Sequence, residues 1–207
     1  MLRIDLSVPF ADKDEVHRLG ARWDRDARVW FVPETCDPSP FARWLPVGGR
    51  INVRAPSYWI AHAVQACWRC RGDSVVHGFA LPKEHQTLWI GDGREPDVWE
   101  SDDEPTFVCY LEYLLPSVAE RMRAEAANYR FGLRWRSRSF YWVNYCQYCN
   151  SKLGDYETFC EPGQAFNPLT RDDAAHIELT PVDAPFAAVA GGWSLGCDLF
   201  EYMTRRV

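Results

Sequence analysis

The pattern of hydrophobic and polar residues divides the chain into a short first unit and a longer second unit. Leu2, Ile4 and Leu6 alternate with polar residues, and this period of two predicts a half-buried strand at the start. Residues 21–32 hold two apolar runs around a polar turn, which predicts a hairpin. The first unit therefore contains one strand at its start and a hairpin further along.

A short helix is predicted between this strand and the hairpin. Asp12 and Glu15 stand three positions apart, as in a capping box, in which each side chain bonds to the backbone of the other residue. Val16 and Leu19 are predicted to face inward, and Gly20 to end the helix. The predicted order is strand, helix, hairpin.

The second unit contains strand-like runs and one clear helix pattern. Residues 58–66 and 74–81 predict two strands, and 133–145 alternates strongly and predicts a third. Residues 117–130 carry apolar side chains at helical spacing directly after Pro116, which predicts the main helix. Less regular runs predict strands at 85–91 and 177–180, a strand or the start of a helix at 107–115, and a short helix at 199–204.

The composition is that of a folded protein. The chain has 207 residues, of which 47% are hydrophobic and 25% charged, and this is too apolar for a disordered chain. The longest run without a charged residue, 184–197, has 14 residues, short of the ~18 that suggest a membrane span. The first residues meet acidic side chains by Asp5 and show no export signal. We expect a cytoplasmic protein that does not enter a membrane.

Eight cysteines in such a chain need an explanation, because cytosolic thiols are kept reduced. Four of them form two Cys-x-x-Cys pairs, Cys67 with Cys70 and Cys146 with Cys149, each at the end of a strand-like run. Two such pairs supply the four thiolates of the tetrahedral site that zinc prefers. The sequence therefore predicts that these four cysteines bind Zn²⁺ as a structural cofactor.

The two pairs are far apart in sequence, with 75 residues between them, whereas about 15–20 is typical of zinc ribbons. Because loop-closure entropy grows with the logarithm of length, the longer separation costs only about 1.3 kcal/mol. Structural zinc contributes on the order of 10 kcal/mol, so the spacing does not exclude the site. Redox-active pairs and unligated thiols stay open as alternatives, and further potential ligands are His62, His77 and His85.

Four motifs of the first unit lie at 8–10, 19–24, 29–33 and 41–46, reading Val-Pro-Phe, Leu-Gly-Ala-Arg-Trp-Asp, Val-Trp-Phe-Val-Pro and Phe-Ala-Arg-Trp-Leu-Pro. Together they resemble a small bacterial domain family of unknown function that occurs in plasmid conjugative primases and other DNA-processing proteins. The resemblance implies an association with mobile DNA and identifies no catalytic residue. The sequence around the two cysteine pairs is similar to split zinc-ribbon proteins of bacteria that carry long insertions, which implies a structural metal.

The predicted fold class is α+β. A small strand-helix-hairpin domain over 1–46 and a linker over 47–56 precede a split four-cysteine zinc-ribbon domain over 57–207, whose long insertion carries the main helix. Trp23, Trp30 and Trp44 are expected to form the core of the small domain, since so small a unit needs large apolar side chains. A base-stacking platform is the alternative for these three residues.

We find no convincing motif for a reaction. His176 and Glu178 follow the cysteines, whereas the corresponding histidine and glutamate of zinc deaminases precede them. A four-cysteine shell leaves no open position for water, and the phosphate-loop, dinucleotide and zinc-protease motifs are absent from the sequence. We therefore assign no catalytic residue and favour a non-enzymatic role.

One candidate binding surface is basic. In a strand, Arg134, Arg136 and Arg138 would project from one face and Trp135 from the other, so the arginines could follow a phosphate backbone. The alternative is that these arginines pair within the molecule with the acidic segment 91–104, which carries a net charge of −6. In the first case the partner is nucleic acid.

The other candidate surface is this acidic segment itself. Trp99 lies close to Asp102, Asp103 and Glu104, and these side chains could dock a basic protein. Two hypotheses for function follow. The first is a zinc-binding accessory module of bacterial DNA-processing or mobile-element systems that contacts nucleic acid, and the second is an acidic adaptor or toxin-neutralising (immunity-type) protein.

Overall fold

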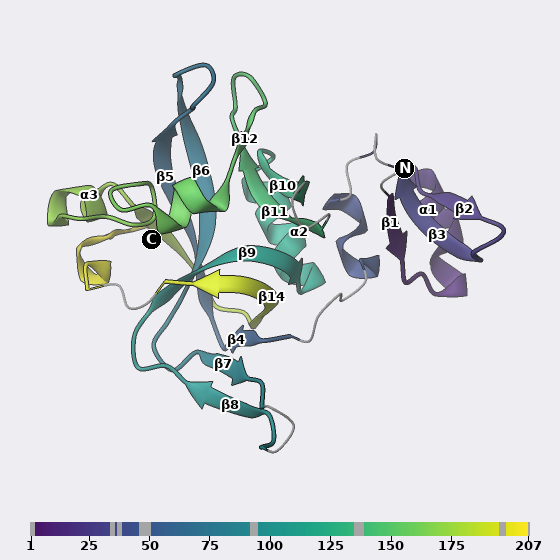
Figure 1. The fold of residues 1–207 in the computed structure, drawn as a ribbon, viewed down its shortest axis with the longest axis horizontal. Coiled ribbons are helices and arrows are strands. Elements are labelled where there is room, and N and C mark those ends of the chain that lie inside the picture. The colour runs from purple at the N-terminus through teal and green to yellow at the C-terminus, as the bar shows by residue number, and fades with distance from the viewer. Residues whose placement is uncertain are drawn as a thin grey trace.

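The computed structural model is a mixed α+β fold that is mostly sheet, with few and short helices (Figure 1). Its strands form one nine-stranded sheet and two three-stranded sheets. The structure describes residues 3–33, 36, 39–45, 51–91, 95–134, 139–194 and 198–206. The expected fold class is therefore confirmed at the level of α+β.

The first unit has the predicted order of strand, helix and hairpin. Its sheet has the order β1-β3-β2, with antiparallel neighbours. The Oδ1 atom of Asp24 accepts hydrogen bonds from the backbone N–H groups of Asp26 and Ala27, which fixes the hairpin turn. The elements are β1 (Arg3–Leu6), η1 (Phe10–Asp12), α1 (Lys13–Arg18), β2 (Arg22–Asp24), β3 (Val29–Pro33) and η2 (Ser39–Trp44).

The predicted capping box at α1 does not form. Asp12 occupies the N-cap position, but its side chain makes no cap hydrogen bond. Its carboxylate instead accepts a hydrogen bond of 2.8 Å from Nε1 of Trp44, and Glu15 accepts one from Arg43. Both acidic side chains therefore anchor η2, because bonds to a distant segment replace the local cap.

The inward face of α1 is narrower than predicted. Val16 is fully buried, whereas Leu19 follows the last helical turn and is exposed. Gly20 ends the helix with φ of +103°, a conformation that glycine adopts without strain. Of the tryptophans predicted as core, Trp44 is buried, but Trp23 is 47% exposed.

The second unit is built around the nine-stranded sheet, whose order is β15-β13-β5-β6-β9-β14-β4-β7-β8. All neighbours are antiparallel except β13 and β15. Part of the stretch predicted as a linker is strand β4, which pairs with β14 and β7. The strands are β4 (Val53–Ala55), β5 (Tyr58–Ala66), β6 (Asp73–Leu81), β7 (Gln86–Trp89), β8 (Val98–Ser101), β9 (Thr106–Leu114), β13 (Glu178–Val182), β14 (Phe186–Trp193) and β15 (Thr204–Arg205).

The main helix, α2 (Pro116–Glu125), begins as predicted but ends earlier than the predicted 130. The residues after it form β10 (Tyr129–Arg134), which pairs with β11 (Ser139–Tyr145) in the second small sheet, and β11 pairs with β12 (Lys152–Leu153). The last two residues of the predicted helix, Tyr129 and Arg130, therefore belong to a strand. Short elements complete the chain: the π-helix η3 (Tyr156–Cys160), α3 (Arg171–Ala175) and η4 (Phe200–Tyr202).

Two clusters of buried side chains make up the core. The larger cluster runs from the first unit into the second, because Phe41 and Trp44 of η2 belong to it together with Val118 and Met122 of α2. The smaller cluster includes Cys67 and Cys146, together with aromatic side chains of the C-terminal third. The first unit thus shares its core with the main helix.

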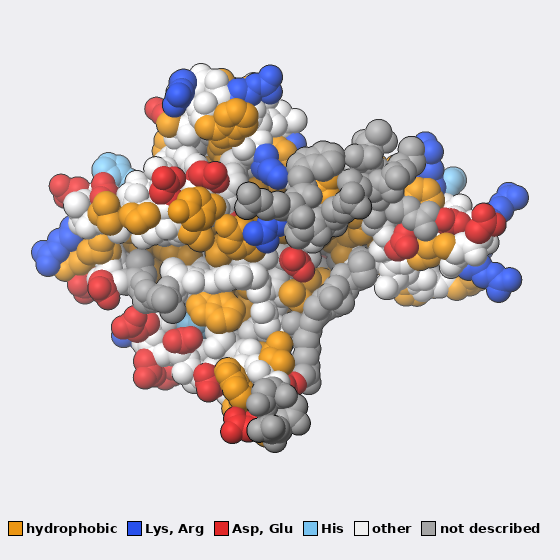
Figure 2. Space-filling model, in the orientation of Figure 1, with side chains coloured by type: hydrophobic (Ala, Val, Ile, Leu, Met, Phe, Trp, Pro, Cys, Tyr) orange, Lys and Arg blue, Asp and Glu red, His pale blue; other side chains and the backbone are white. Residues whose placement is uncertain are grey.

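Charged and apolar side chains are unevenly distributed over the surface. Red acidic side chains gather around β7 and β8, while orange and blue side chains gather where the β5–β6 and β11–β12 hairpins end (Figures 1 and 2). Among the described residues, no helix combines the length and the apolar character that crossing a membrane requires.

Candidate metal centre

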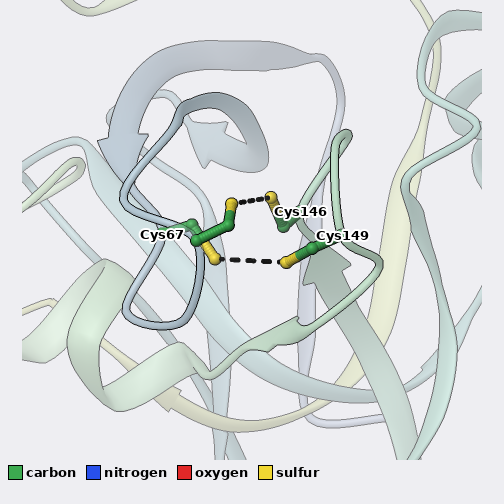
Figure 3. A group of neighbouring side chains, drawn as sticks. Cys67, Cys146 and Cys149 are labelled. Atoms are coloured by element: carbon green, nitrogen blue, oxygen red, sulfur yellow. Dashed lines mark hydrogen bonds between the residues drawn. The ribbon is translucent and has the colours of Figure 1, made fainter.

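The four paired cysteines, distant in sequence, meet at the ends of two hairpins. Cys67 and Cys70 lie in the turn between β5 and β6, and Cys146 and Cys149 in the turn between β11 and β12. All four Sγ atoms lie within 4.8 Å of one another. The sulfurs of the two turns point toward each other, and the distance is 3.6 Å from Cys67 to Cys149 and 3.6 Å from Cys70 to Cys146 (Figure 3).

These distances match a tetrahedral metal site. With Zn–S bonds of about 2.3 Å, the edges of a sulfur tetrahedron are about 3.8 Å long. A disulfide requires about 2.05 Å, and the four cysteines are free thiols. The cluster therefore has the size of a four-thiolate metal site and is too wide for disulfide bonds.

The two turns have the same backbone construction. In the first, the N–H of Arg71 donates to the carbonyl of Cys67 at 2.9 Å, and in the second the N–H of Asn150 donates to that of Cys146 at 2.9 Å. Arg71 and Asn150 both adopt positive φ, 62° and 56°, which turns the chain back toward its hairpin. Two equivalent turns thus present two sulfurs each.

Polar side chains connect the two hairpins below the sulfurs. The side-chain amide of Asn144 on β11 donates to the carbonyl of His77 on β6 and accepts from its N–H, both at 2.8 Å. The N–H of Val75 donates to Gln147 at 3.1 Å, and Asn128 donates to the carbonyl of Val75 at 2.8 Å. The hairpins belong to different sheets, so these bonds set their relative position.

The thiols differ in acidity. Hydrogen bonds from the hydroxyl and N–H of Ser151 lower the pKa of Cys149 to about 6, and backbone hydrogen bonds from residues 149 and 148 lower the pKa of Cys146. A backbone hydrogen bond from Gly72 lowers the pKa of Cys70, but desolvation and the neighbouring sulfurs outweigh it and raise the value to about 12. A divalent cation would offset the repulsion between neighbouring thiolates, so that all four thiols could be deprotonated as they coordinate it.

The histidines considered as further ligands lie elsewhere. His62 and His77 face each other across β5 and β6, with ring centroids 5.1 Å apart, and line a cavity of about 880 Å³. Burial and the neighbouring His62 lower the pKa of His77 to about 4, which keeps its ring neutral at pH 7. His85 bonds to the carbonyl of Pro82. Within the part of the chain that the structure describes, the group that could hold an ion consists of the four cysteines.

The predicted basic surface lies mainly outside the described residues, since Trp135, Arg136 and Arg138 fall in the gap 135–138. Arg134 is described, and its guanidinium lies 4.4 Å from the centroid of the Tyr110 ring. The part of this surface that the structure describes therefore packs on an aromatic ring of β9.

The predicted acidic surface lies on β8, which carries Trp99, and on the residues directly after it. Trp99 is partly buried, with the guanidinium of Arg54 at 4.1 Å from its ring centroid. Asp102 lies 3.6 Å from Nε2 of His85. Asp103 and Glu104 are exposed. Of the four residues, two thus have partners within the chain and two point to solvent.

Sequence reasoning missed the residues that support the sulfurs. Ser151 lies 3.3 Å from the sulfur of Cys149, and Asn128, Asn144 and Gln147 connect the hairpins. Ser151, Asn144 and Gln147 lie beside the second cysteine pair in sequence, whereas Asn128 precedes it by 18 residues. An isolated amide does not reveal a partner 53–72 residues away.

The protein thus combines a four-cysteine cluster in its second unit with a first unit that matches a known family. Residues 3–46 match a family model described as Domain of unknown function (DUF5710). They form a DUF5710 domain, as the motifs of the first unit predicted.

Two curated proteins, both called DNA primase TraC and both from Escherichia coli, are similar to the N-terminal part. One is 55% identical over 53 residues, which is 26% of this chain and 5% of the primase. The other is 51% identical over 39 residues, which is 19% of this chain and 3% of the primase. The chain thus spans a twentieth or less of these relatives, and the cysteine turns lie beyond the DUF5710 match. No solved structure matches the chain.

Proposed function

We propose that this protein is a non-enzymatic, zinc-binding accessory module of bacterial DNA-processing or mobile-element systems and that it contacts nucleic acid. The observation that carries the proposal is the four-cysteine cluster in a chain that also contains a DUF5710 domain. Two proteins named DNA primase are similar in sequence to the N-terminal part of this chain.

Zinc is the ion that fits the donor set best. Four thiolates are soft ligands and favour zinc or iron over magnesium or calcium. Zinc would join the β5–β6 and β11–β12 hairpins as the two halves of a split zinc ribbon. A closed shell of four sulfurs leaves no coordination position for water, so the ion would serve the fold and not a reaction.

The four-cysteine cluster also bears on where in the cell the protein is located. Thiols must be reduced and deprotonated to hold the ion, and the cytoplasm keeps thiols reduced. A cytoplasmic location is therefore part of the proposal, and it agrees with a role beside DNA-processing enzymes.

Metal analysis and a DNA-binding measurement test the proposal. Protein purified without a metal-binding tag is expected to contain one zinc per chain, and Cys67→Ser and Cys146→Ser to lose it. Cys160→Ser is the matched control, because Cys160 is exposed and outside the cluster. Binding to a labelled oligonucleotide is expected to weaken steeply as salt rises. Protein without zinc would contradict the metal-binding part of the proposal. Binding that does not depend on ionic strength would contradict the nucleic-acid part.

A second candidate function is capture of a basic protein. The observation that favours it is the run of exposed carboxylates at Glu100, Asp103 and Glu104, on the side of the molecule where Figure 2 shows acidic side chains gathered. Replacing Asp103 and Glu104 by Asn and Gln is expected to abolish capture of such a partner in a pull-down from native cells. Unchanged capture would exclude this surface.

A further inference from the structure

Two large aromatic side chains are exposed at the cysteine turns. Trp68 is 65% exposed and Tyr148 is 70% exposed, and each lies between the two cysteines of its own turn. Most of the Phe, Trp and Tyr side chains that the structure describes in the second unit are buried or partly buried. Aromatic rings held at a protruding tip are available to a partner.

Both rings are fixed in place by the opposite hairpin. Nε1 of Trp68 donates a hydrogen bond of 2.9 Å to the carbonyl of Lys152. The ring of Tyr148 lies against Gly72, where an added Cβ would come within 3.0 Å of its Cδ2 atom. Each aromatic side chain thus crosses from one turn to the other. The rings are preorganised, which reduces the entropy lost when a ligand binds them.

Cationic side chains surround the two rings. Arg69 and Arg71 are exposed on the first turn. Lys152 follows the second turn, but its Nζ atom donates to the carbonyl of Leu133 on β10 and is not one of these cations. Nη2 of Arg130 donates to Oδ1 of Asn150 at 2.6 Å, which places a third cation beside the second turn. Figure 2 shows orange and blue side chains together at this end of the molecule.

The tip carries charges of both signs. Asp73 is an exposed carboxylate beside the first turn, and a zinc ion with four thiolates would carry a charge of −2. Arg69, Arg71 and Arg130 offset this negative charge, and the two arginines of the first turn are exposed, so their guanidinium groups are available to a phosphate.

We infer that this tip, formed by Trp68, Arg69, Arg71 and Tyr148, is a stacking platform for single-stranded nucleic acid. The inference rests on the proposed function and names its contact surface. Exposed rings flanked by cations suit unpaired bases, because a base stacks on the ring while the cations contact the phosphates. In a duplex the base faces are already stacked inside the helix, so the rings would add little.

The test is fluorescence anisotropy of the full chain with a labelled oligothymidine of about 12 nucleotides and with a duplex of equal length. We expect Trp68→Ala and Tyr148→Ala each to weaken single-strand binding at least about fivefold. Trp89→Ala and Tyr156→Ala are the controls, because both side chains are exposed away from the tip, and we expect no change. Zinc content is measured for every variant to show that the cluster is intact.

A conservative variant separates stacking from structure. Trp68→Phe keeps an aromatic face but loses the N–H that bonds to Lys152. We expect it to restore most of the binding that Trp68→Ala removes. A Phe variant as weak as the Ala variant would overturn the inference, because the hydrogen bond and not the ring would then account for the loss.

The cations are tested through the salt dependence. If Arg69 and Arg71 contact phosphates, replacing each by Gln lowers the slope of log affinity against log salt by about 0.7. Unchanged slopes would overturn their assigned role.

The outcomes distinguish this inference from the proposed function. If the wild-type protein binds neither single strands nor duplex, its nucleic-acid role fails and the platform with it. If it binds but the Trp68 and Tyr148 variants bind equally well, or if duplex binding is tighter and independent of both rings, only the platform fails. Zinc binding is decided separately by the metal content.

Discussion

Replacing Asp155 by Asn should change how stability depends on pH. Asp155 is 1% exposed and precedes the π-helix η3. Its Oδ2 atom accepts a hydrogen bond of 2.6 Å from the N–H of Tyr110, while Oδ1 is buried without a hydrogen-bond partner among the described residues. Burial raises the pKa of Asp155 to about 7, although the Tyr110 N–H and Arg134 oppose the shift.

The sign and size of the effect follow from this pKa. The folded state holds the Asp155 proton up to about pH 7, whereas the unfolded chain releases it near the ordinary value of 3.8. The stabilisation from the protonated carboxyl is therefore complete below about pH 4 and is lost as pH rises to about 7. At 1.36 kcal/mol per pKa unit, the loss is about 4 kcal/mol above pH 7.

Asp155→Asn keeps an oxygen acceptor for Tyr110 and removes the ionisation. Its amide nitrogen would take the place of the unpartnered Oδ1 atom, which costs about 1–3 kcal/mol at every pH. At pH 5 the wild type has already lost about 1.6 kcal/mol of its stabilisation, so the variant lies within about 1.5 kcal/mol of wild type there, and at pH 8 it is more stable by about 1–3 kcal/mol. Between these two values the stability difference is expected to shift by about 3 kcal/mol in favour of the variant.

Urea denaturation of both proteins at pH 5, 6, 7 and 8, with zinc present, measures this shift. The pH dependence of metal binding is common to both proteins and cancels in the difference, because both keep the four cysteines. Parallel pH profiles for Asp155→Asn and wild type would refute the reasoning, since Asp155 would then titrate as an ordinary carboxyl in the folded state.

Two further predictions concern packing and metal. Gly78→Ala is expected to destabilise the protein by about 1–3 kcal/mol, because the new Cβ would lie 2.8 Å from the Phe159 ring, and a wild-type melting temperature would contradict this close approach. Chelation of the metal is expected to raise hydrogen exchange in the two cysteine turns while β5 and β6 below them stay protected, as measured by mass spectrometry, and uniform loss of protection would contradict it.

The sequence predicted features that depend on neighbouring residues. Strand β5 has the predicted bounds. The Cys-x-x-Cys spacing identified the residues of both turns, because turn chemistry is local, and the four sulfurs do lie together. The main helix was predicted to continue to residue 130 from the helical spacing of its apolar residues, but pairing with β11 takes Tyr129 and Arg130 into a strand. The predicted cap of α1 is absent for a similar reason, since the Asp12 carboxylate accepts a hydrogen bond from Trp44 and not from the helix backbone.

The order of the nine strands had no signal in the sequence. β14 lies between β4 and β9, and β13 pairs with β5, although these partners are far apart along the chain. Such pairings are selected by how buried faces fit together, which a single sequence does not specify. The same limit applies to the tip, where Trp68 and Tyr148 were visible only as residues between cysteines.

The 75 residues between the cysteine pairs are part of the folded body, and this changes the role expected for the metal. They contain β6, β7, β8, β9, α2, β10 and β11, so a metal at the cluster would not close a flexible loop. Asn144 already joins β6 to β11 through two hydrogen bonds with His77, and both strands contribute to a buried core. The loop-closure cost estimated from sequence separation is therefore an upper limit. It follows that a metal would fix the geometry of the two turns more than it would hold the sheets together, and that geometry is what a stacking surface at the tip requires.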